Sequence, residues 1–556
     1  MDNVRFILIV AFLTICYWLW QAWQIDYAPK PTISTTDAPV VAANHREENQ
    51  VPVKAVNTVA NPVIHVTTDK LDLEIDTEGG TIRRLDLLQY PTEKNNTAAN
   101  WLRQLVGLDA KIANVQPIRL FNTDAEKTFL AQSGLIAEAG SMIAPDHHQH
   151  FQSQQTRYQL AENQQQLVVP LTWDNGQGLQ ISKILTFTRD SYGIQLTQQV
   201  VNRSAYAWTG RQYLQLMRTS YVDKSSNSFI RTYTGGVVYT EEDKYQKVSF
   251  EDMDKTALNT HSIGGWAAMI QHYFAAAWIP PVNQDNQFYS KQLGDNHYAI
   301  GTLSGVTTVP AHTEVKFNAQ LFAGPKIQPL MEKYAKGLEL TVDYGWLTLV
   351  GKPIYALLNI LHNSVQNWGI AILGVTFCIK LLFFPLSQSS YRSMAKMRKV
   401  QPQLKALQEQ FADDRPRFNT EMMDLYRREK VNPLGGCLPI LVQIPVFISL
   451  YWVLIETVEI RQAPFLLWIQ DLSAQDPFYL LPVLYGITMK IQQSLNPAPV
   501  DPVQAKVMQM FPVIFTVFFL FFPSGLVLYW ICNNTLSIIQ QWYITRSIEN
   551  DPRLTH

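Results

Sequence analysis

The chain has 556 residues, of which 47% are hydrophobic and 12% aromatic, and its formal net charge at pH 7 is −1. Its length leaves room for several domains, and a mean hydropathy of −0.07 fits a mixture of membrane-embedded and water-exposed parts. The four cysteines form no CxxC pair, no His/Cys cluster suggests a metal, and no GxxxxGK[ST] nucleotide loop is present. We therefore expect no metal and no cofactor, and no nucleic-acid site is evident.

The charges are distributed unevenly along the chain. Residues 26–340 hold 27 lysines and arginines against 31 acidic residues, whereas residues 391–430 hold 10 against 6. Basic segments next to membrane spans stay on the cytoplasmic side. The asymmetry predicts that 391–430 is cytoplasmic and is compatible with 26–340 lying on the other side of the membrane.

The amino-terminal region is apolar over residues 4–23. This run is long for the hydrophobic part of a cleaved signal peptide, and no small-x-small cleavage site follows it. We therefore predict an uncleaved transmembrane anchor in residues 1–25, with its amino end inside. Residues 26–62 are rich in Pro, Thr, Ala, Val and Asn without sustained periodicity, which is typical of a flexible tether.

The region from 63 to 325 alternates apolar and polar residues with a period of two, as in LQISKILTFTRDSYGIQLTQQVV. Glycine, asparagine and aspartate mark the breaks between such stretches. Many strands without intervening helices favour a large all-β sandwich. Together with a short helix predicted at 327–336, this domain is expected to span 63–340.

For two features inside this domain we prefer a structural explanation to a functional one. The aromatic-rich segment 264–281 fits a buried strand pair better than a ligand site. His147, His148 and His150 fit a surface loop better than a metal site.

Five apolar segments follow, and we predict that they cross the membrane: 369–386, 438–455, 477–493, 507–522 and 525–544. With an inside amino end, these crossings return the carboxyl end to the cytoplasm, in agreement with the charge asymmetry. The expected divisions are an interfacial amphipathic helix at 341–353, a first core helix at 354–390, a cytoplasmic helical hairpin at 391–433, four further core helices at 434–546 and a short tail at 547–556.

The first of these segments carries a single charge, Lys380, near its middle. At about 1.5 Å rise per residue, Lys380 lies ~16–18 Å from Trp368 and from Tyr391, too far for its side chain to reach either interface. An unpaired charge at mid-bilayer costs about 2.5–3.5 kcal/mol on insertion scales, so such residues usually face a polar cavity or a partner. A structural ion pair, or a helix shifted until Lys380 becomes interfacial, is the alternative.

Polar side chains recur on the same helical face as Lys380 and on other crossings. They are Thr376 and Ser387 on the same predicted helical face as Lys380, Gln443 in the second crossing, and Asn533, Ser537, Gln540 and Gln541 in the last. Hydrogen bonding between helices explains any one of them. The whole set, which includes a lysine, favours a hydrated cavity.

Acidic residues are absent from the apolar cores of the five crossings. Glu456 and Glu459 fall at the outer end of the second crossing and would have to reach inwards to pair with Lys380. Proton-coupled transporters usually embed carboxylates or histidines. This absence weighs against a transporter and leaves a positive site able to receive a negative charge from another molecule.

The basic loop has a pattern of its own. Met397, Val400, Leu404, Leu407 and Phe411 repeat at helical spacing, and Phe418, Met422 and Leu425 continue it after a turn. Two short antiparallel helices would bury these faces against each other, with Pro402 kinking or restarting the first. The exposed basic face suits protein binding, and it suits topology and anionic lipid headgroups equally well.

Four long strings carry a resemblance to a known family. They are MAKMRKVQPQLKALQEQ (394–410), EMMDLYRREKVNPLGGCLPILVQIPVFISLYWVL (421–454), RQAPFLLWIQDLSAQDPFYLLPVLYGITM (461–489) and FPVIFTVFFLFFPSGLVLYWICNN (511–534). Their order and spacing resemble the YidC/Oxa/Alb family of membrane protein insertases, in its Gram-negative branch with a large periplasmic domain. The similarity covers essentially 341–546, and the anchor and β region match that branch in architecture.

The resemblance implies an N-terminal anchor plus a five-helix core around a hydrophilic groove, and a periplasmic β-supersandwich related in shape to sugar mutarotases. The positive groove residue, commonly arginine in the family, is Lys380 here, which keeps the charge but loses the planar fork of donors. The implied substrate contacts are Lys380, Thr376, Gln443, Tyr529 and Trp530. The implied recruitment surface on the hairpin comprises Arg392, Lys396, Arg398, Lys399, Arg415, Arg417, Arg427 and Arg428.

The resemblance also implies an activity without catalysis: insertion and folding of nascent membrane proteins, alone or with the Sec translocon. Implied partners are nascent membrane proteins, SecYEG and SecDF, the ribosome and signal recognition particle pathway, and membrane lipids. The expected location is the bacterial inner membrane, with both termini cytoplasmic and 26–340 periplasmic. A secondary transporter or channel using Lys380 as an ion or substrate site, and a periplasmic carbohydrate-binding or enzymatic domain on an anchor, are the rival interpretations.

Overall fold

A computed structural model places a β-sandwich before a helical region in the chain. It describes residue 51 and residues 62–93, 97–109, 115–221, 232–411, 414–429, 438–496 and 502–549. The expected fold class, an all-β domain followed by a helical region, is confirmed over these ranges. The predicted anchor, nearly all of the predicted tether and most of the predicted tail lie outside the described residues.

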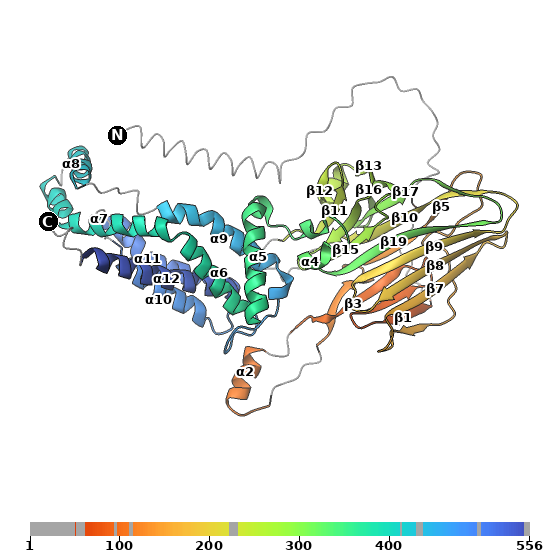
Figure 1. Cartoon of the computed structure of the whole chain (residues 1–556), viewed down its shortest axis with the longest axis horizontal. Helices are drawn as coiled ribbons and strands as arrows, with labels where there is room; N and C mark the ends of the chain where they lie inside the picture. Colours follow the sequence, from red (N-terminus) through yellow and green to blue (C-terminus); the bar gives the residue numbers. More distant parts are fainter. Residues whose placement is uncertain are drawn as a thin grey trace, which may run out of the picture. The chain divides into compact units, whose positions relative to one another are not determined.

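The larger sheet of the sandwich has 11 strands, and its neighbours pair antiparallel except for β1 and β6 (Figure 1). In spatial order its main path is β13 (Asn259–Ile263), β16 (Asp285–Gly294), β17 (His297–Ser304), β10 (Trp208–Thr219), β5 (Phe129–Ala137), β3 (Ile82–Pro91), β2 (Leu71–Asp76), β1 (Val63–Thr67) and β6 (Arg157–Gln159). Off this path, β18 (Thr307–Val309) pairs with β10 and β4 (Pro117–Phe121) pairs with β3.

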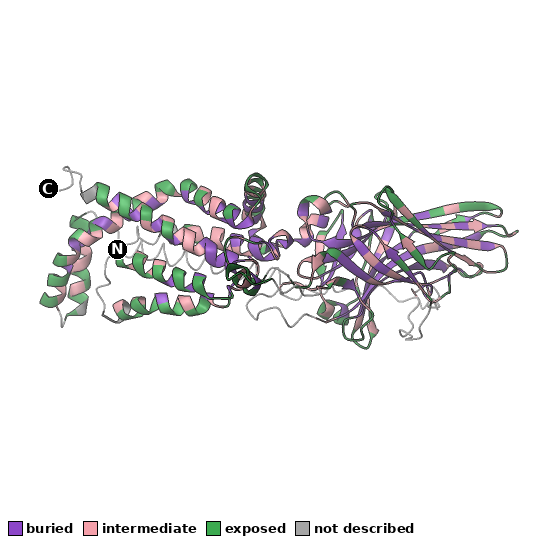
Figure 2. Ribbon diagram, turned by 90° about the horizontal axis from the view of Figure 1, so that it is seen from below, coloured by how far each residue is buried: buried purple, intermediate pink, exposed green. Residues whose placement is uncertain are grey.

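The second sheet has eight strands, all joined antiparallel. In spatial order they are β12 (Lys244–Val248), β11 (Gly235–Thr240), β14 (Trp266–Ile270), β15 (Phe274–Ile279), β19 (Thr313–Pro325), β9 (Gly193–Asn202), β8 (Leu179–Thr188) and β7 (Gln166–Asp174). The alternation read from the sequence reappears as burial: every second residue of β8 is buried. Figure 2 shows the same striping on the strands.

The two local expectations within this domain had different outcomes. The aromatic-rich segment 264–281 forms the antiparallel pair β14 and β15, in which every residue is buried, as predicted. The histidines do lie in a loop, but the expectation that they are on the surface is wrong for His147, which is 6% exposed. Its Nδ1 lies 2.6 Å from the Tyr213 hydroxyl, so a buried hydrogen bond holds the ring inside.

Lys183 is fully buried on the inward face of β8. Its ammonium group donates to the carbonyl oxygens of Ser133, at 2.9 Å, and of Gly79, and it lies over the ring of Phe151. Burial lowers the pKa of Lys183 to about 7, because a charged group is costly in a dry interior.

This burial predicts a pH-dependent stability. Above its folded-state pKa of about 7 the buried Lys183 is neutral, whereas an unfolded lysine holds its proton up to about pH 10.4. The unfolded state then binds more protons, so the free energy of unfolding should rise between those pH values, by at most about 1.4 kcal/mol per pH unit. Thermal unfolding of the wild type and of Lys183→Met across this range measures the slope. Equal slopes in the two proteins would contradict the prediction.

The helices of the β domain are short: α2 (Ala98–Leu105), α3 (Phe250–Lys255), α4 (Gln328–Met331) and the 3-10 turns η1 (Leu338–Thr341) and η2 (Gly345–Leu347) at its end. The helical region then comprises α5 (Thr348–Val365), α6 (Trp368–Leu382), α7 (Phe384–Gln410), α8 (Arg415–Arg428), α9 (Leu438–Glu456), the 3-10 turn η4 (Val458–Ile460), α10 (Leu480–Ser494), α11 (Pro502–Phe519) and α12 (Ser524–Glu549). The predicted crossing 369–386 overlaps α6 and α7, and each of the other four overlaps one of these helices.

The first predicted crossing is not one straight helix. It breaks at Phe383, where α6 and α7 meet at a bend of 67°. Pro385 lies in the first turn of α7, a position where proline favours the start of a new helix. Over the described ranges, no helix is by itself long and apolar enough to qualify as a membrane span, whereas the bent pair of α6 and α7 does qualify.

The predicted hairpin is formed by the end of α7 and by α8. Its core contains Val400 and Leu404 from α7 and Leu425 and Tyr426 from α8, which confirms the helical pattern read from the sequence. Pro402 does not restart the first arm, because α7 continues through it to Gln410. The packing of Val400 and Leu404 against α8 supports the helix on both sides of the proline.

Candidate functional site

The helix α6 carries the lysine that the sequence singled out. Its amino end is capped by Asn367, whose side chain accepts a hydrogen bond from the backbone of Ile370. Lys380 lies in the last turn, where the negative end of the helix dipole favours a cation. α6 packs against α5 and α12 (Figure 1).

Lys380 is enclosed, with 8% of its surface exposed. Its Nζ donates to the Ser537 hydroxyl of α12 at 2.7 Å, and that hydroxyl donates in turn to the backbone oxygen of Asn533. Thr376, one turn earlier on α6, is 1% exposed and donates to its own helix at Ile372. The structure thus brings together Thr376, Lys380 and Ser537, as the sequence pattern indicated.

No carboxylate forms an ion pair with Lys380 among the residues that the structure describes. The two acids at the outer end of α9 are engaged elsewhere: Glu456 pairs with Lys326 at 3.0 Å, and Glu459 accepts a hydrogen bond from the Tyr355 hydroxyl. The alternative of a structural ion pair for Lys380 finds no support in this part of the chain. Among the described residues, its hydrogen-bond partner is the neutral hydroxyl of Ser537.

Further buried polar side chains lie along α7 and α12. Ser387 is 2% exposed, but the break at Phe383 puts it on α7 and corrects the expectation that it shares a straight helix with Lys380. Sequence reasoning missed Ser390 and Asn534, which are 3% and 6% exposed, because single polar residues at helical spacing look the same whether they face protein or water.

Tyr529 and Trp530 lie in an aromatic cluster two turns from Ser537 on α12. The Trp530 ring packs against Phe447 of α9 and Phe519 of α11, with centroids 4.5 and 5.9 Å away. The buried indole Nε1 of Trp530 has no hydrogen-bond partner among the described residues. A buried donor without a partner is costly, so this group is available to a polar ligand or to water.

Gln443 lies half-buried on α9, and no hydrogen bond links it to Thr376 or Lys380. The basic residues of the hairpin divide by environment. Arg398 donates to the backbone oxygen of Ser494 in α10. The exposed ones are Arg392, Lys396, Lys399, Arg417, Arg427 and Arg428, and the Arg415 side chain is not among those that the structure describes.

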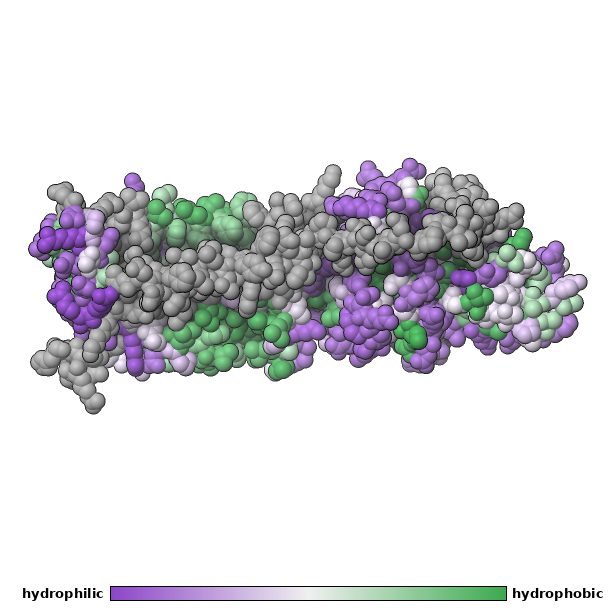
Figure 3. Space-filling model, turned by 90° about the horizontal axis from the view of Figure 1, so that it is seen from above, coloured by the Kyte–Doolittle hydropathy of each residue, from purple (hydrophilic) through white to green (hydrophobic). Residues whose placement is uncertain are grey.

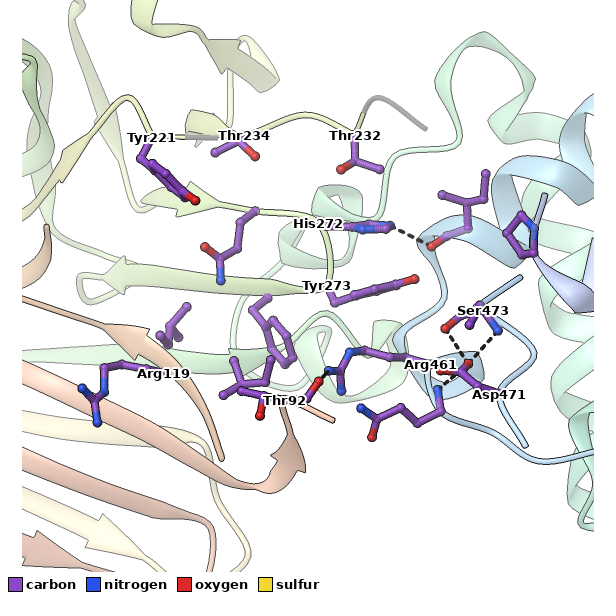
Figure 4. A pocket seen from close by; sticks show the side chains of 18 of the residues that line it. Thr92, Arg119, Tyr221, Thr232, Thr234, His272, Tyr273, Arg461, Asp471 and Ser473 are labelled. Atoms are coloured by element: carbon purple, nitrogen blue, oxygen red, sulfur yellow. Dashed lines mark hydrogen bonds between the residues drawn. The ribbon is translucent and has the colours of Figure 1, made fainter. Parts of the chain in front are cut away.

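A pocket of about 1340 Å³ lies elsewhere, between strands of the β domain and the segment that follows α9. Figure 4 shows His272, Tyr273 and Arg461 on its walls. His272 Nε2 lies 3.0 Å from the backbone oxygen of Ile455, and Arg461 donates to the backbone oxygen of Pro91 at 2.8 Å. None of the predicted site residues lines it, and these contacts hold its walls together.

The exterior of the helical region is apolar. Exposed side chains include Leu381 on α6, Val483 on α10, Val513 on α11 and Ile539 on α12, each at least 49% exposed. Figure 3 shows hydrophobic side chains gathered over these helices, with hydrophilic ones at the hairpin. An apolar exterior around a buried lysine is the reverse of the arrangement in a water-soluble protein and is typical of the class of membrane proteins.

The comparisons with known proteins agree with this class. The family described as YidC periplasmic domain matches residues 63–357, and that described as 60Kd inner membrane protein matches residues 360–551. The chain belongs to the YidC family of membrane protein insertases, which confirms the resemblance seen in the sequence.

Similar proteins match along almost the whole length. A protein of Methylococcus capsulatus named membrane protein insertase YidC is 51% identical over 99% of each chain. One of the same name from Nitrosococcus oceani is 45% identical and covers 99% of this chain and 100% of its own. A crystal structure of an active YidC insertase matches 89% of this chain and 95% of its own, with 18% identity and a TM-score of 0.38.

Proposed function

We propose that this protein inserts nascent membrane proteins into the bacterial inner membrane along a polar path centred on Lys380. The observation that carries the proposal is a buried ammonium group held only by the Ser537 hydroxyl, with no ion pair among the described residues. A resident cation without a counterion attracts a transient negative charge. An acidic residue of a substrate supplies that charge.

The proposed path is closed at one end of the helical region and open at the end near the hairpin. Towards the start of α6 and α12 the helices share an apolar core that includes Ile372, Leu450 and Val527. Towards the hairpin the buried side chains are polar, with Ser387, Ser390 and Gln541 beyond Lys380. Water and a hydrophilic chain therefore enter from the hairpin side, and the opposite side is sealed.

The energetics match a passage without nucleotide hydrolysis. At an effective dielectric constant of ~20, two charges about 4 Å apart attract each other by about 4 kcal/mol, which offsets part of the cost of bringing a carboxylate into the membrane. The apolar segment of the substrate then partitions into lipid, and that transfer drives the reaction. A single positive site binds the substrate only weakly, so the substrate is then released. We assign no catalytic residue.

The hairpin and the termini complete the proposal. The exposed basic residues of α7 and α8 receive the substrate, the ribosome or anionic lipid on the cytoplasmic side. Both termini are cytoplasmic, residues 26–340 are periplasmic, and the Sec translocon is a partner for larger substrates. Thr376, Gln443, Tyr529 and Trp530 contact the substrate as it passes.

Photocrosslinking tests the path directly. A photoreactive residue at Gln443 or Trp530 is expected to form adducts with ribosome-stalled chains of a short membrane protein. Ile539 is the matched control, because it is 56% exposed and lies two residues, about 200° of helix rotation, beyond Ser537. Adducts from Ile539 alone, with none from Gln443 or Trp530, would refute the path.

A further inference from the structure

The helix α2 of the β domain carries its apolar side chains on the outside. It is inserted between β3 and β4 and begins at Thr97, whose hydroxyl accepts a hydrogen bond from the backbone of Asn100. Asn100 is 5% exposed, so the polar side chain is inside. The large apolar side chains that are outside are Leu102, Leu105, Val106 and Leu108, which are 46%, 67%, 64% and 53% exposed.

These exposed residues form one stripe. Leu102, Leu105 and Val106 follow the i, i+3, i+4 spacing that puts side chains on one face of a helix, and Leu108 extends it past the helix end. Single exposed leucines are ordinary on a soluble surface, but a continuous stripe of them marks a contact with another apolar phase. The short helix has no other element covering this face over the described ranges.

A second apolar surface adjoins α2. Trp101 packs edge-on against Trp468, with ring centroids 6.4 Å apart. Trp468 belongs to the segment between α9 and α10 and is fixed by its Nε1, which donates to Asp476. The two residues before it, Leu466 and Leu467, are 55% and 60% exposed. The stripe of α2 therefore continues into an exposed pair of leucines at the end of the helical region.

Contacts of this segment fix its level along the helices. Asn367, the cap of α6, donates through its side-chain amide to the backbone oxygen of Phe465 at 3.1 Å. The Phe465 ring also packs against Gly369 and leaves no room there for a Cβ. Leu466 and Leu467 thus lie beside the start of α6, at the end of the helical region opposite the basic hairpin. Trp368, the first residue of α6, is of the type enriched at membrane interfaces.

The strand that leads into α2 is tied to the same segment. Arg461 donates to the backbone oxygens of Pro91 and Thr92, and the Gln462 side-chain amide also donates to Pro91. The aromatic contact of Trp101 and these hydrogen bonds are independent of each other. Together they hold α2 next to the outer ends of the helices.

We propose that α2 is a lipid anchor: Leu102, Leu105, Val106 and Leu108, together with Leu466 and Leu467, insert into the outer leaflet of the bilayer. The inference rests on the proposed membrane location of the helical region. The occupant is phospholipid because the stripe is continuous with the ends of the proposed spans. A short amphipathic helix at this level lies in the interface plane and fixes the orientation of the β domain over the core.

Spin labels at single cysteines in the full chain, reconstituted into vesicles of phosphatidylethanolamine and phosphatidylglycerol, test the anchor. Cys16, Cys378, Cys437 and Cys532 are first replaced by serine. A label at Leu105→Cys is expected to be accessible to oxygen and shielded from a water-soluble nickel chelate. A label at Val282→Cys, which is 75% exposed in the β domain, is expected to show the reverse.

The outcomes separate this inference from the proposed function. Nickel accessibility at Leu105→Cys equal to that at Val282→Cys, with Ile539→Cys of α12 in lipid, would refute the anchor and leave the spanning core intact. Water exposure at both Leu105→Cys and Ile539→Cys would instead refute the proposed membrane location. Shielding of Leu105→Cys from both oxygen and nickel would show a protein partner or a second copy on the stripe, and would also overturn the lipid assignment.

Discussion

Replacing Lys380 by alanine is expected to reduce the insertion of a short, acidic-tailed membrane protein by at least tenfold, whereas Lys380→Arg should support it. The Coulomb attraction available at this site is about 4 kcal/mol, and the loss of one third of it, about 1.4 kcal/mol, already changes a rate tenfold. Arginine keeps the charge and adds a fork of donors. Insertion into vesicles, at equal levels of each variant, measures the effect.

The fold itself should tolerate this change. Lys380 has no carboxylate partner among the described residues, so alanine leaves no buried charge unpaired, and only the Ser537 hydroxyl loses a donor. Lys490→Ala is the matched control, because Lys490 lies exposed on α10. If Lys380→Ala inserts the substrate as well as the wild type and Lys490→Ala do, the charge has no part in insertion.

The local sequence pattern was sufficient to predict the strands and helices in which apolar residues recur at a regular spacing. The alternation over 63–325 predicted the sandwich, because a two-sheet core buries every second residue of a strand. The helical spacing of Val400, Leu404 and Leu425 predicted the core of the hairpin. In both cases the evidence is the regular spacing of apolar residues, which depends only on residues close together in the sequence.

The break between α6 and α7 shows where that reasoning stops. By composition, residues 369–386 form one apolar run. Their hydropathy does not indicate whether the helix axis changes direction within the run. Pro385 was the available sign, since proline favours the first turn of a helix. The run therefore ends one helix and starts another.

Tertiary partners of buried polar groups also escaped the sequence. Lys183 falls on the inward positions of β8, so its burial follows from the alternation, but the carbonyls of Gly79 and Ser133 that satisfy it come from other strands and turns. Lys380 was found because a lysine in an apolar run is conspicuous. Its hydroxyl partner, Ser537, is 157 positions away and was expected only as one of several polar residues on the last helix.

The partner of Glu456 is the clearest example. From the sequence it was a candidate to reach inwards to Lys380, yet it pairs with Lys326, which directly follows β19. The two side chains are only 2% and 5% exposed, and Lys326 also donates to the backbone oxygen of Thr341. This pair fastens the end of the last β strand to the outer end of α9.

Removing one member of this pair should cost far more than removing both. A charge left buried without its partner typically destabilises a protein by about 3–5 kcal/mol, whereas an apolar replacement of the whole pair is often neutral. Lys326→Met and Glu456→Leu are therefore each expected to lower the thermal unfolding midpoint of the full chain strongly, and the double variant should recover most of the loss.

Lys336→Met is the control, because its ion pair with Glu241 is exposed and pairs of that kind contribute about 0–1 kcal/mol. Losses that add up in the double variant would show that the two side chains act independently. Recovery would establish the ion pair as a buried fastening between the β domain and the core helices, at the same end of the helices as α2.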